Sequence, residues 1–195
     1  MLLEAPFTEE KIRKLRVGDK VEITGLLYTG RDAVHKYLHE GGKPPVDLTN
    51  SIIYHCGPVV SRSDAGEYKF IAAGPTTSIR EEPYEADVLE YFGVRAIIGK
   101  GGMGPETLQA CQHHKAVYLH AIGGAASLIA HSVKEVVDVY QRDELGIPEA
   151  FWVIRVEHFP AVVTMDSHGD SLHAEVKERS TALLQTLIRA GSSYG

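Results

Sequence analysis

The chain has 195 residues, of which 44% are hydrophobic and 24% charged, so it is long enough for one sizeable core. Its net charge of −6 comes without blocks of lysine or arginine, which argues against nucleic-acid binding. The sequence contains no apolar run near the roughly 20 residues of a membrane span and no signal-peptide pattern, so we expect a cytoplasmic protein with no membrane partner.

The first half of the chain is predicted to be rich in strands. Residues 1–18 form a lead-in segment, in which apolar and basic residues alternate over Lys11–Arg16 and predict a short edge strand. The elements predicted next are a strand at Val21–Tyr28, a helix at Arg31–Glu40, and short strands at Ser51–Tyr54 and Tyr68–Ala73. Gly41-Gly42 is the expected end of the helix.

The second half is predicted to alternate helices and strands. These elements are a helix at Tyr84–Phe92, a buried strand at Val94–Ile98, a helix at Pro105–His114, a strand at Ala116–Ile122 and a long helix at Ala125–Tyr140. A strand pair bent at Pro160 follows, over Phe151–His158 and Ala161–Met165, and an amphipathic helix over Glu175–Arg189 closes the chain. We therefore predict one α/β domain over residues 1–195, with 171–195 as its C-terminal helix and tail.

Cations and hydroxyls gather on glycine-rich turns. Gly74–Ser78 reads Gly-Pro-Thr-Thr-Ser between a predicted strand and a helix, Arg80 follows it, and Gly99–Gly102 reads Gly-Lys-Gly-Gly. Amides freed at such junctions favour anions, although a turn with Thr or Ser helix caps has the same pattern. With Arg31, the turns offer three cations, enough to clamp both carboxylates of a dicarboxylic acid.

The segment Gly99–Gly104 also matches G-x-G-x-x-G between a strand and a helix. A dinucleotide site needs an acidic residue about 20 positions further on, and here none occurs before Glu135. No Ser or Thr follows the Gly-Lys pair, so the segment is not a P-loop either. We interpret Lys100 as an anion contact. At the next such junction, His120–Ala126, a ligand contact and close packing are equally consistent with the small residues.

Cysteines and histidines show no metal-site spacing. Cys56 and Cys111 are far apart in the sequence and are predicted to be buried thiols, too few for an iron–sulfur cluster. His35 and His39 are four residues apart, but no third ligand is apparent, so we predict a solvated helix face and no metal site. Asp166–Asp170 contains Asp, Ser and His, and is predicted to be a polar turn because such close neighbours cannot form a triad.

Six motifs follow one another in a specific order. They are Thr29–Lys36, Gly57-Pro58, Gly74–Ser78, Gly99–Gly101, His120–Ala126 and Glu149–Ala161. Together they closely resemble the beta subunit, or C-terminal domain, of class I iron–sulfur fumarate hydratases and L-tartrate dehydratases, from about residue 15 to 170. The resemblance implies a swivelling β/β/α fold and a partner alpha subunit that carries a [4Fe–4S] cluster, with an α2β2 assembly by analogy.

The resemblance also implies roles for five residues. The substrate-binding arginine of the family falls on Arg31, and its proton-transfer threonine falls on Thr76, with Thr77 beside it. Its second arginine falls on Arg80 and its Gly-Lys-Gly lysine on Lys100. We therefore predict Thr76, Arg80 and Lys100 as catalytic, and all five as substrate-binding.

One segment departs from the family pattern. Relatives often read Ser-Gly-Arg-Met-Asp where this chain has Ser78-Ile79-Arg80-Glu81-Glu82. Arg80 is kept, but the bulkier Ile79 and the additional acid leave the pocket shape and the substrate open.

The residues and the resemblance point to the same chemistry. Removing water from a 2-hydroxy dicarboxylate takes a proton from beside a carboxylate, so charge builds up where preorganised cations and hydroxyls stabilise it. We predict a hydro-lyase subunit that interconverts fumarate and L-malate, with no cofactor in this chain. An L-tartrate dehydratase subunit, a non-catalytic anion-binding module and a nucleotide-binding oxidoreductase domain are the alternatives. Thr76, a weak base when unassisted, is a proton relay or a hydrogen-bond donor as readily as a base.

Overall fold

Strands and helices alternate along most of the chain. The computed structural model describes residues 1–191, so residues 192–195 of the predicted tail lie outside the described part. The elements are β1 (Leu2–Glu4), α1 (Glu9–Ile12), β2 (Lys20–Thr29), α2 (Asp32–His39), β3 (Ile52–Tyr54), β4 (Val59–Arg62), β5 (Tyr68–Ala72), the 3₁₀ turn η1 (Ser78–Arg80), α3 (Glu82–Phe92), β6 (Ala96–Gly99), α4 (Pro105–His114), β7 (Val117–His120), α5 (Ala126–Ala130), β8 (Val133–Tyr140), α6 (Arg142–Leu145), β9 (Phe151–Met165) and α7 (Leu172–Gly191).

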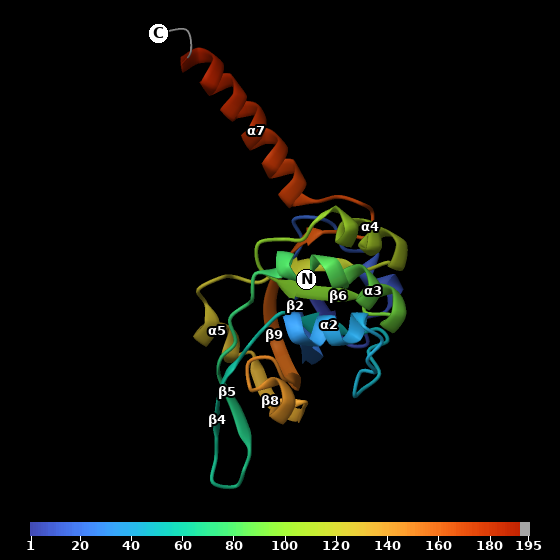
Figure 1. Cartoon of the computed structure of the whole chain (residues 1–195), viewed down its shortest axis with the longest axis vertical. Helices are drawn as coiled ribbons and strands as arrows, with labels where there is room; N and C mark the ends of the chain where they lie inside the picture. The colour runs from blue at the N-terminus through green and yellow to red at the C-terminus, as the bar shows by residue number, and fades with distance from the viewer. Residues whose placement is uncertain (192–195) are drawn as a thin grey trace.

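A mixed seven-stranded sheet forms the body of the protein (Figure 1). The strand order is β1-β2-β3-β6-β7-β9-β8, in which β1, β2, β3, β6 and β7 run parallel and β9 runs antiparallel to its neighbours. β9 also pairs with β2 along most of its length, so β2, β3, β6, β7 and β9 close into a ring. The 15 residues of β9 make this possible, because its first half pairs with β8 and its second half with β7.

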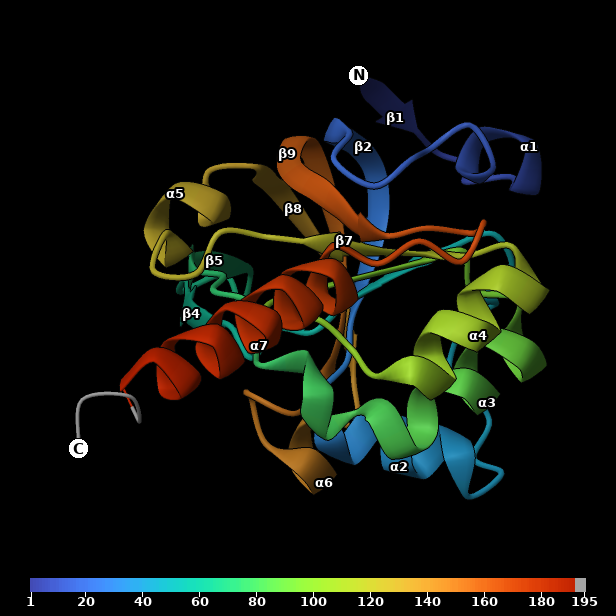
Figure 2. The ribbon, with the colours of Figure 1, turned by 90° about the horizontal axis from the view of Figure 1, so that it is seen from above.

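The central parallel strands β3, β6 and β7 are buried on both faces, as their apolar sequences require. Successive side chains of a strand point to opposite faces, so Ile52 and Tyr54 belong to the core inside the ring, while Ile53 belongs to the core beneath the helices. The outer core also contains Val34 of α2 and Val88 of α3. In Figure 2, α2, α3 and α4 lie together on one side of the sheet and α5 lies on the other.

Two elements project from the body in opposite directions (Figure 1). Helix α7 extends away from the sheet, and the β4–β5 hairpin extends at the other end. The sequence pattern missed β4, and the other strand of the hairpin is the predicted strand at Tyr68–Ala73.

The predicted single-domain α/β fold, a mixed sheet with flanking helices, is confirmed, whereas the residue limits of the domain stay a prediction. Helix α4 has the predicted limits, and α3 ends at Gly93, which takes the left-handed conformation at φ 63°. The strands at β2, β3, β6 and β7 and the helix α2 are confirmed within one or two residues. Among residues 1–191, no helix is long and apolar enough to cross a membrane.

The long helix predicted over Ala125–Tyr140 is wrong. Only Ala126–Ala130 is helical there, and Val133–Tyr140 is strand β8. Val133, Val136 and Val139, three residues apart, all pack against the inner core because the pairing with β9 shifts register between them. Tertiary pairing therefore decided the structure of a segment whose spacing fits a helix as well.

Two further strand predictions need correction. Lys11–Arg16 is not a strand, because α1 covers its beginning, and the edge strand of the lead-in is β1 instead. The strand pair expected around Pro160 is the single strand β9, in which Pro160 lies opposite Glu22 of β2. The break in regular pairing lies nearby, where His158 takes a positive φ of 51° and the β2–β9 register shifts.

Candidate functional site

The glycine-rich turns meet at one edge of the sheet. Parallel strands β2, β3, β6 and β7 all end there, and they are followed by Gly30-Arg31, His55–Gly57, Lys100 and Ala121 respectively. The carboxyl edge of parallel strands is where open α/β sheets bind their ligands. The topology thus brings together turns that lie up to 90 residues apart in the sequence.

Arg31 is held between two loops at this edge. It occupies the N-cap position of α2, and its Nε lies 3.2 Å from Oε1 of Glu149. The other oxygen of Glu149 accepts a hydrogen bond from the Ala33 amide at 3.2 Å. A Cβ added to Gly57 would lie 2.5 Å from Nη1 of Arg31, so only glycine leaves room for the guanidinium there.

Thr76 and Lys100 belong to neighbouring, hydrogen-bonded loops. The Thr76 amide donates to the His55 carbonyl at 2.6 Å, and the Lys100 amide donates to the Thr76 carbonyl at 3.2 Å. The Ser78 amide donates back to the Lys100 carbonyl at 3.0 Å. These bonds fix Thr76, half-buried, and Thr77, exposed, next to Lys100.

Arg80 meets the Arg31 loop at Asp32. Its Nη2 lies 3.3 Å from Oδ2 of Asp32, and both side chains are almost half exposed. The buried Glu81 hydrogen-bonds to Asp32, and this bond is the main cause that lowers the pKa of Asp32. Burial, followed by the same bond, raises the pKa of Glu81 to about 8. Glu81 therefore keeps its proton at neutral pH and donates it to the Asp32 carboxylate.

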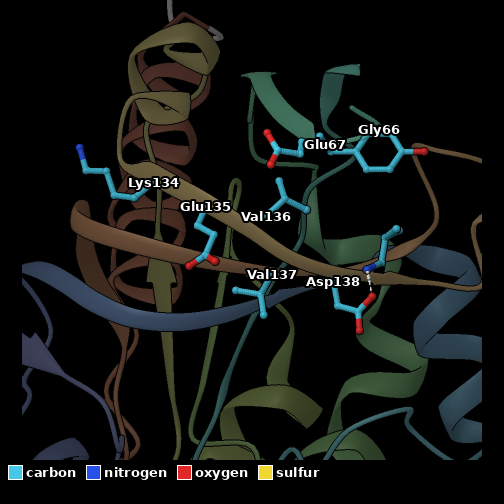
Figure 3. Close-up of a pocket in the computed structure, with 9 residues that line it drawn as sticks. Gly66, Glu67, Lys134, Glu135, Val136, Val137 and Asp138 are labelled. Atoms are coloured by element: carbon cyan, nitrogen blue, oxygen red, sulfur yellow. Dashed lines mark hydrogen bonds between the residues drawn. The ribbon is translucent and has the colours of Figure 1, made fainter. Parts of the chain in front are cut away.

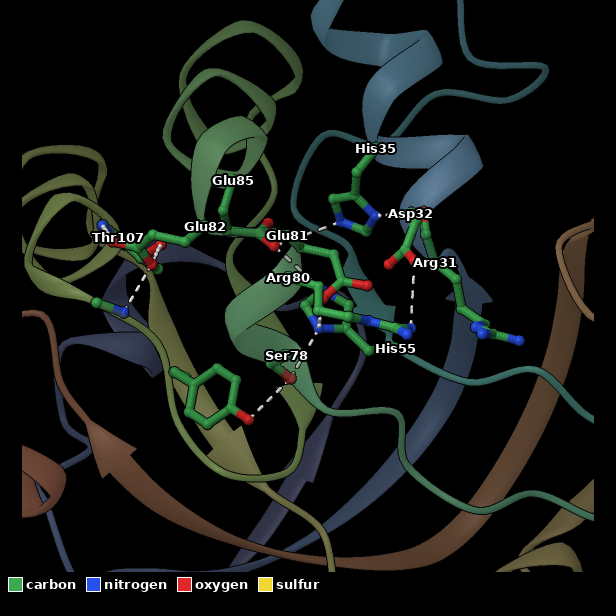
Figure 4. Close-up of polar contacts among 12 residues, drawn as sticks. Arg31, Asp32, His35, His55, Ser78, Arg80, Glu81, Glu82, Glu85 and Thr107 are labelled. Carbon is green, nitrogen blue, oxygen red and sulfur yellow. Dashed lines mark hydrogen bonds and ion pairs between the residues drawn. The ribbon is translucent and has the colours of Figure 1, made fainter.

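Behind these loops lies a buried network of ionisable side chains (Figure 4). Glu85 Oε2 of α3 lies 3.4 Å from Nε2 of His35 and 3.1 Å from Nε2 of His55, and all three side chains are fully buried. Ser78 Oγ lies 2.9 Å from Nδ1 of His55 and accepts a hydrogen bond from the Tyr118 hydroxyl at 2.9 Å. The predicted solvated helix face is therefore wrong for His35, because α3 covers it.

The network shifts the pKa of each member. Burial opposes charge on Glu85, but His35 and His55 outweigh it and lower its pKa. Burial likewise opposes charge on His35, but Glu85 outweighs it and raises the pKa of His35. For His55 burial prevails, and its pKa is lowered. Charge on Glu85 and on His35 is thus favoured by the other partner, whereas burial disfavours charge on His55.

His35, His55 and Glu85 are also the one group of three among residues 1–191 whose donor atoms could hold a metal ion. Their closest contacts, 3.1 and 3.4 Å, have ion-pair and hydrogen-bond lengths. Each Nδ1 atom has its own partner as well, the Arg31 carbonyl for His35 and Ser78 for His55. The two Nδ1 atoms are therefore hydrogen-bonded, whereas the two Nε2 atoms lie at ion-pair distance from Oε2 of Glu85 without hydrogen bonds of good geometry.

The resemblance assigns the iron–sulfur cluster to a partner chain, and the chemistry of the two cysteines here does not fit such a group. Cys56 and Cys111 are free and buried, as predicted, and they belong to the inner and outer cores respectively. Burial raises the pKa of Cys56 to about 12 and also raises that of Cys111, so both stay protonated thiols. Cluster ligands are thiolates, which neither residue provides.

A carboxylate occupies the helix start that follows the G-x-G-x-x-G segment. Glu82 accepts hydrogen bonds from the amides of Gly104, Glu106 and Thr107 at 2.6 to 3.2 Å, and from the Thr107 hydroxyl at 2.7 Å. These amides are the ones that would bind a pyrophosphate. The structure agrees with the interpretation that the segment is not a dinucleotide site.

The five residues predicted for the site lie on the loops of one edge. Arg31 and Arg80 are linked through Asp32, and Thr76, Thr77 and Lys100 through backbone bonds. Sequence reasoning missed the residues behind them, although His55 directly follows β3, a position that could have indicated a site. A cavity of about 490 Å³ between the β4–β5 hairpin and β8 contains none of the five in its lining (Figure 3).

Two other expectations concern nearby loops. Asp166–Asp170 is the predicted polar turn, in which Oδ1 of Asp166 accepts hydrogen bonds from the amides of His168 and Asp170. At the His120–Ala126 junction, Lys100 crosses Gly123, where an added Cβ would lie 3.6 Å from Cδ of the lysine. That distance is an ordinary van der Waals contact, and the tighter packing at this junction is at Ala126, whose Cβ would lie 3.1 Å from a Cβ added to Gly74.

Comparisons with known proteins agree on one family. A family profile described as Fumarase C-terminus matches residues 1–176. A putative fumarate hydratase class I of Geobacillus stearothermophilus is 57% identical over 91% of this chain, which spans only 34% of that protein. A putative L(+)-tartrate dehydratase subunit beta of Methanocaldococcus jannaschii is 42% identical, over 93% of this chain and 95% of its own length. The L(+)-tartrate dehydratase subunit beta of Escherichia coli K12 is 42% identical, over 91% and 88% respectively.

Proposed function

The chain belongs to the fumarase C-terminus family, and we propose that it is the beta-type subunit of a hydro-lyase acting on a C4 dicarboxylate. We propose reversible hydration of fumarate to L-malate as its reaction. The sequence identity of 57% to a putative class I fumarate hydratase supports this choice. A cytoplasmic location is part of the same proposal.

One observation carries the proposal above all. Two arginines from different loops meet at the carboxyl edge of the sheet, since Arg31 directly precedes Asp32 at the start of α2 and Nη2 of Arg80 lies 3.3 Å from Oδ2 of Asp32. Lys100 adds a third cation on the adjoining loop. Cations fixed on separate loops can bind the two carboxylates of one substrate and fix its orientation.

The proposed chemistry assigns distinct tasks to these residues. During dehydration, the C–H bond beside a carboxylate breaks and its electron pair forms the double bond as the hydroxyl group leaves. Negative charge gathers on that carboxylate meanwhile, and Arg31, Arg80 and Lys100 stabilise it. Thr76 stands on a loop fixed by two backbone hydrogen bonds, so its hydroxyl can pass the proton on or donate a hydrogen bond at a fixed place.

The proposed site is half of an active site. A dicarboxylate bound at the exposed Thr77 and half-exposed Arg80 would stay open to water unless a second chain covered it. The two buried thiols hold no cluster, so we assign the [4Fe–4S] cluster to a partner alpha subunit, in an α2β2 assembly. We derive no step through that cluster from this chain.

A second candidate substrate is L-tartrate, because two L(+)-tartrate dehydratase beta subunits are each 42% identical to this chain, over 93% and 91% of it. The higher identity, 57%, is to the putative fumarate hydratase, and it places fumarate first in the proposal.

An anaerobic hydration and dehydration assay tests the proposal. The chain is assayed alone and mixed with its candidate iron–sulfur partner, against fumarate, L-malate and L-tartrate. We expect activity only in the mixture, with fumarate and malate preferred. Preference for tartrate would select the second candidate. An inactive mixture with a verified intact cluster would refute a hydro-lyase for these substrates and favour a non-catalytic anion-binding module.

A further inference from the structure

The buried network of His35, His55 and Glu85 has no task in the proposed chemistry. None of these side chains is exposed, so none can touch a substrate directly. Burying ionised groups costs several kcal/mol each unless they are paired with good geometry. Because this cost is borne directly behind the proposed binding edge, the contacts of the three side chains with the loops of that edge are informative.

Both ends of the network terminate on the substrate loops. Nδ1 of His35 lies 3.1 Å from the carbonyl oxygen of Arg31. On the other side, His55 contacts Ser78 through its ring, and its own carbonyl accepts the Thr76 amide at 2.6 Å. In Figure 4, His35 and His55 lie next to each other beside Glu81 and Glu85, and their ring centroids are 4.8 Å apart in a T-shaped contact.

The partners assign the protons. The Arg31 carbonyl only accepts hydrogen bonds, so Nδ1 of His35 carries a proton, and a second proton on Nε2 faces the Glu85 carboxylate at 3.4 Å as an ion pair. Tyr118 donates to Ser78, which leaves the Ser78 hydroxyl to donate to Nδ1 of His55. The single proton of His55 then sits on Nε2, towards Glu85. Hydrogen bonds thus hold the two Nδ1 atoms, and ion-pair contacts with Glu85, short of hydrogen-bond geometry, join the two Nε2 atoms.

We propose that Glu85, His35 and His55 are positioning residues, which set the relative placement of the Arg31 loop and the Thr76–Arg80 loop through this network of hydrogen bonds and ion-pair contacts. The inference rests on the proposed function, because it assigns these loops to substrate binding. Glu85 is the central member, since it holds both imidazoles from α3. The carboxyl groups of Glu81 and Asp32 also face the network, and the two imidazole rings contact each other as a T-shaped pair.

The same two helices supply a matched control. His39 of α2 lies 2.6 Å from Asp87 of α3, but these side chains are 39% and 32% exposed. This pair has the same chemistry as His35–Glu85, one helical turn away on α2. Among residues 1–191, the side chains of His39 and Asp87 make no hydrogen bond or ion pair to the Arg31 loop or to the Thr76–Arg80 loop. Glu85→Gln and Asp87→Asn therefore make the same chemical change on one helix, in the network and outside it.

Nuclear magnetic resonance of the full chain tests the network without any assay of activity. We expect His35 to carry two ring protons at pH 7 and His55 to carry only the Nε2 proton. In Glu85→Gln, His35 becomes neutral, and the signals of the Thr76 amide and of Arg31 Nε shift. In Asp87→Asn these signals stay in place. A neutral His35 in the wild-type chain, or stoichiometric metal in the purified protein, would overturn the inference.

Kinetics of the complex with the partner subunit then test the positioning role. We expect Glu85→Gln to lower kcat/KM about 10- to 100-fold, mainly through a higher KM, since small misplacements of binding groups have effects of this size. Asp87→Asn should change it less than about 2-fold. Combined with Arg31→Lys, Glu85→Gln should give a smaller loss than the product of the single losses. Multiplicative losses, with wild-type Thr76 and Arg31 signals, refute positioning.

A replacement variant and a readout that does not need activity cover the two ways in which these experiments could fail. If Glu85→Gln does not fold, Ser78→Ala breaks the network at one hydroxyl while leaving the buried charges paired, and the same signals and kinetics are measured on it. If the wild-type complex lacks activity, the proposed function fails, and the proton assignments and the shifts at Thr76 and Arg31 still decide the network.

Discussion

Helices α2 and α3 face each other through two histidine–carboxylate pairs that differ in burial. His35–Glu85 is fully buried, whereas His39–Asp87 is about one-third exposed. The exposed pair is shorter, 2.6 Å against 3.4 Å, so distance alone would rank it as the stronger contact. Burial reverses this ranking, because water cannot replace a partner lost from the interior. The comparison teaches that the surroundings of a contact decide what its loss costs.

The largest expected effect is on stability. Glu85→Ala leaves the His35 charge buried without its carboxylate, which should cost about 3–5 kcal/mol of unfolding free energy. Asp87→Ala removes an exposed partner and should cost less than about 1 kcal/mol. Urea unfolding of the full chain at pH 7 measures both. Equal losses would show that burial does not separate the two pairs.

Removing a cation at the edge should separate activity from stability. Arg80 is almost half exposed, so Arg80→Ala should lower the unfolding free energy by less than about 1 kcal/mol. If Arg80 stabilises charge in the transition state, the same change lowers kcat/KM of the complex by about 10²–10³, and Lys100→Ala does likewise. Near wild-type activity of both variants would remove them from the mechanism. Arg62→Ala, on the β4–β5 hairpin, is the matched control.

Glu81 differs from Glu85 because it is buried without a positively charged side chain paired with it. The pKa of Glu81 is raised to about 8, so between pH 4.5 and 8 the folded chain holds a proton that the unfolded chain releases. Stability must therefore fall as pH rises through this window, by up to about 1.4 kcal/mol per pH unit from this group.

The variant Glu81→Gln tests this sign, since its amide can donate to Asp32 without titrating. Relative to the wild type it should gain stability between pH 5 and pH 8, in contrast to Glu85→Gln, which loses the His35 pair. Thermal or urea unfolding at the two pH values gives the difference. A constant difference between Glu81→Gln and the wild type would mean that Glu81 is ionised in the folded chain.

The sequence predicted best those helices whose first or last turn contains a proline or a glycine. Pro105 at the first turn of α4 and Gly93 after α3 fix those helices in the chain itself. Strand β8 was predicted as a helix because its valines fit both periodicities, and only pairing with β9 distinguishes them. His35 was predicted on a solvated face because the carboxylate that buries it comes from another helix, 50 residues further on.

The same distinction holds for the candidate site. Arg31, Thr76 and Lys100 stand in glycine-rich motifs that are visible in the sequence, and the structure places these motifs on one edge. His55 and Glu85 stand in no motif, and their meeting depends on β3 and α3 packing together in three dimensions. Residues of the second kind become visible only once the fold is known.

The carboxylate of Glu82 at the start of α4 has a consequence for selectivity among cellular anions. A nucleotide phosphate that approached the three amides would have to displace a competitor attached to the same chain. Such a tethered group acts at an effective concentration in the millimolar range or above, which does not fall when the protein is diluted. The start of α4 therefore carries its own permanent competitor against phosphate binding.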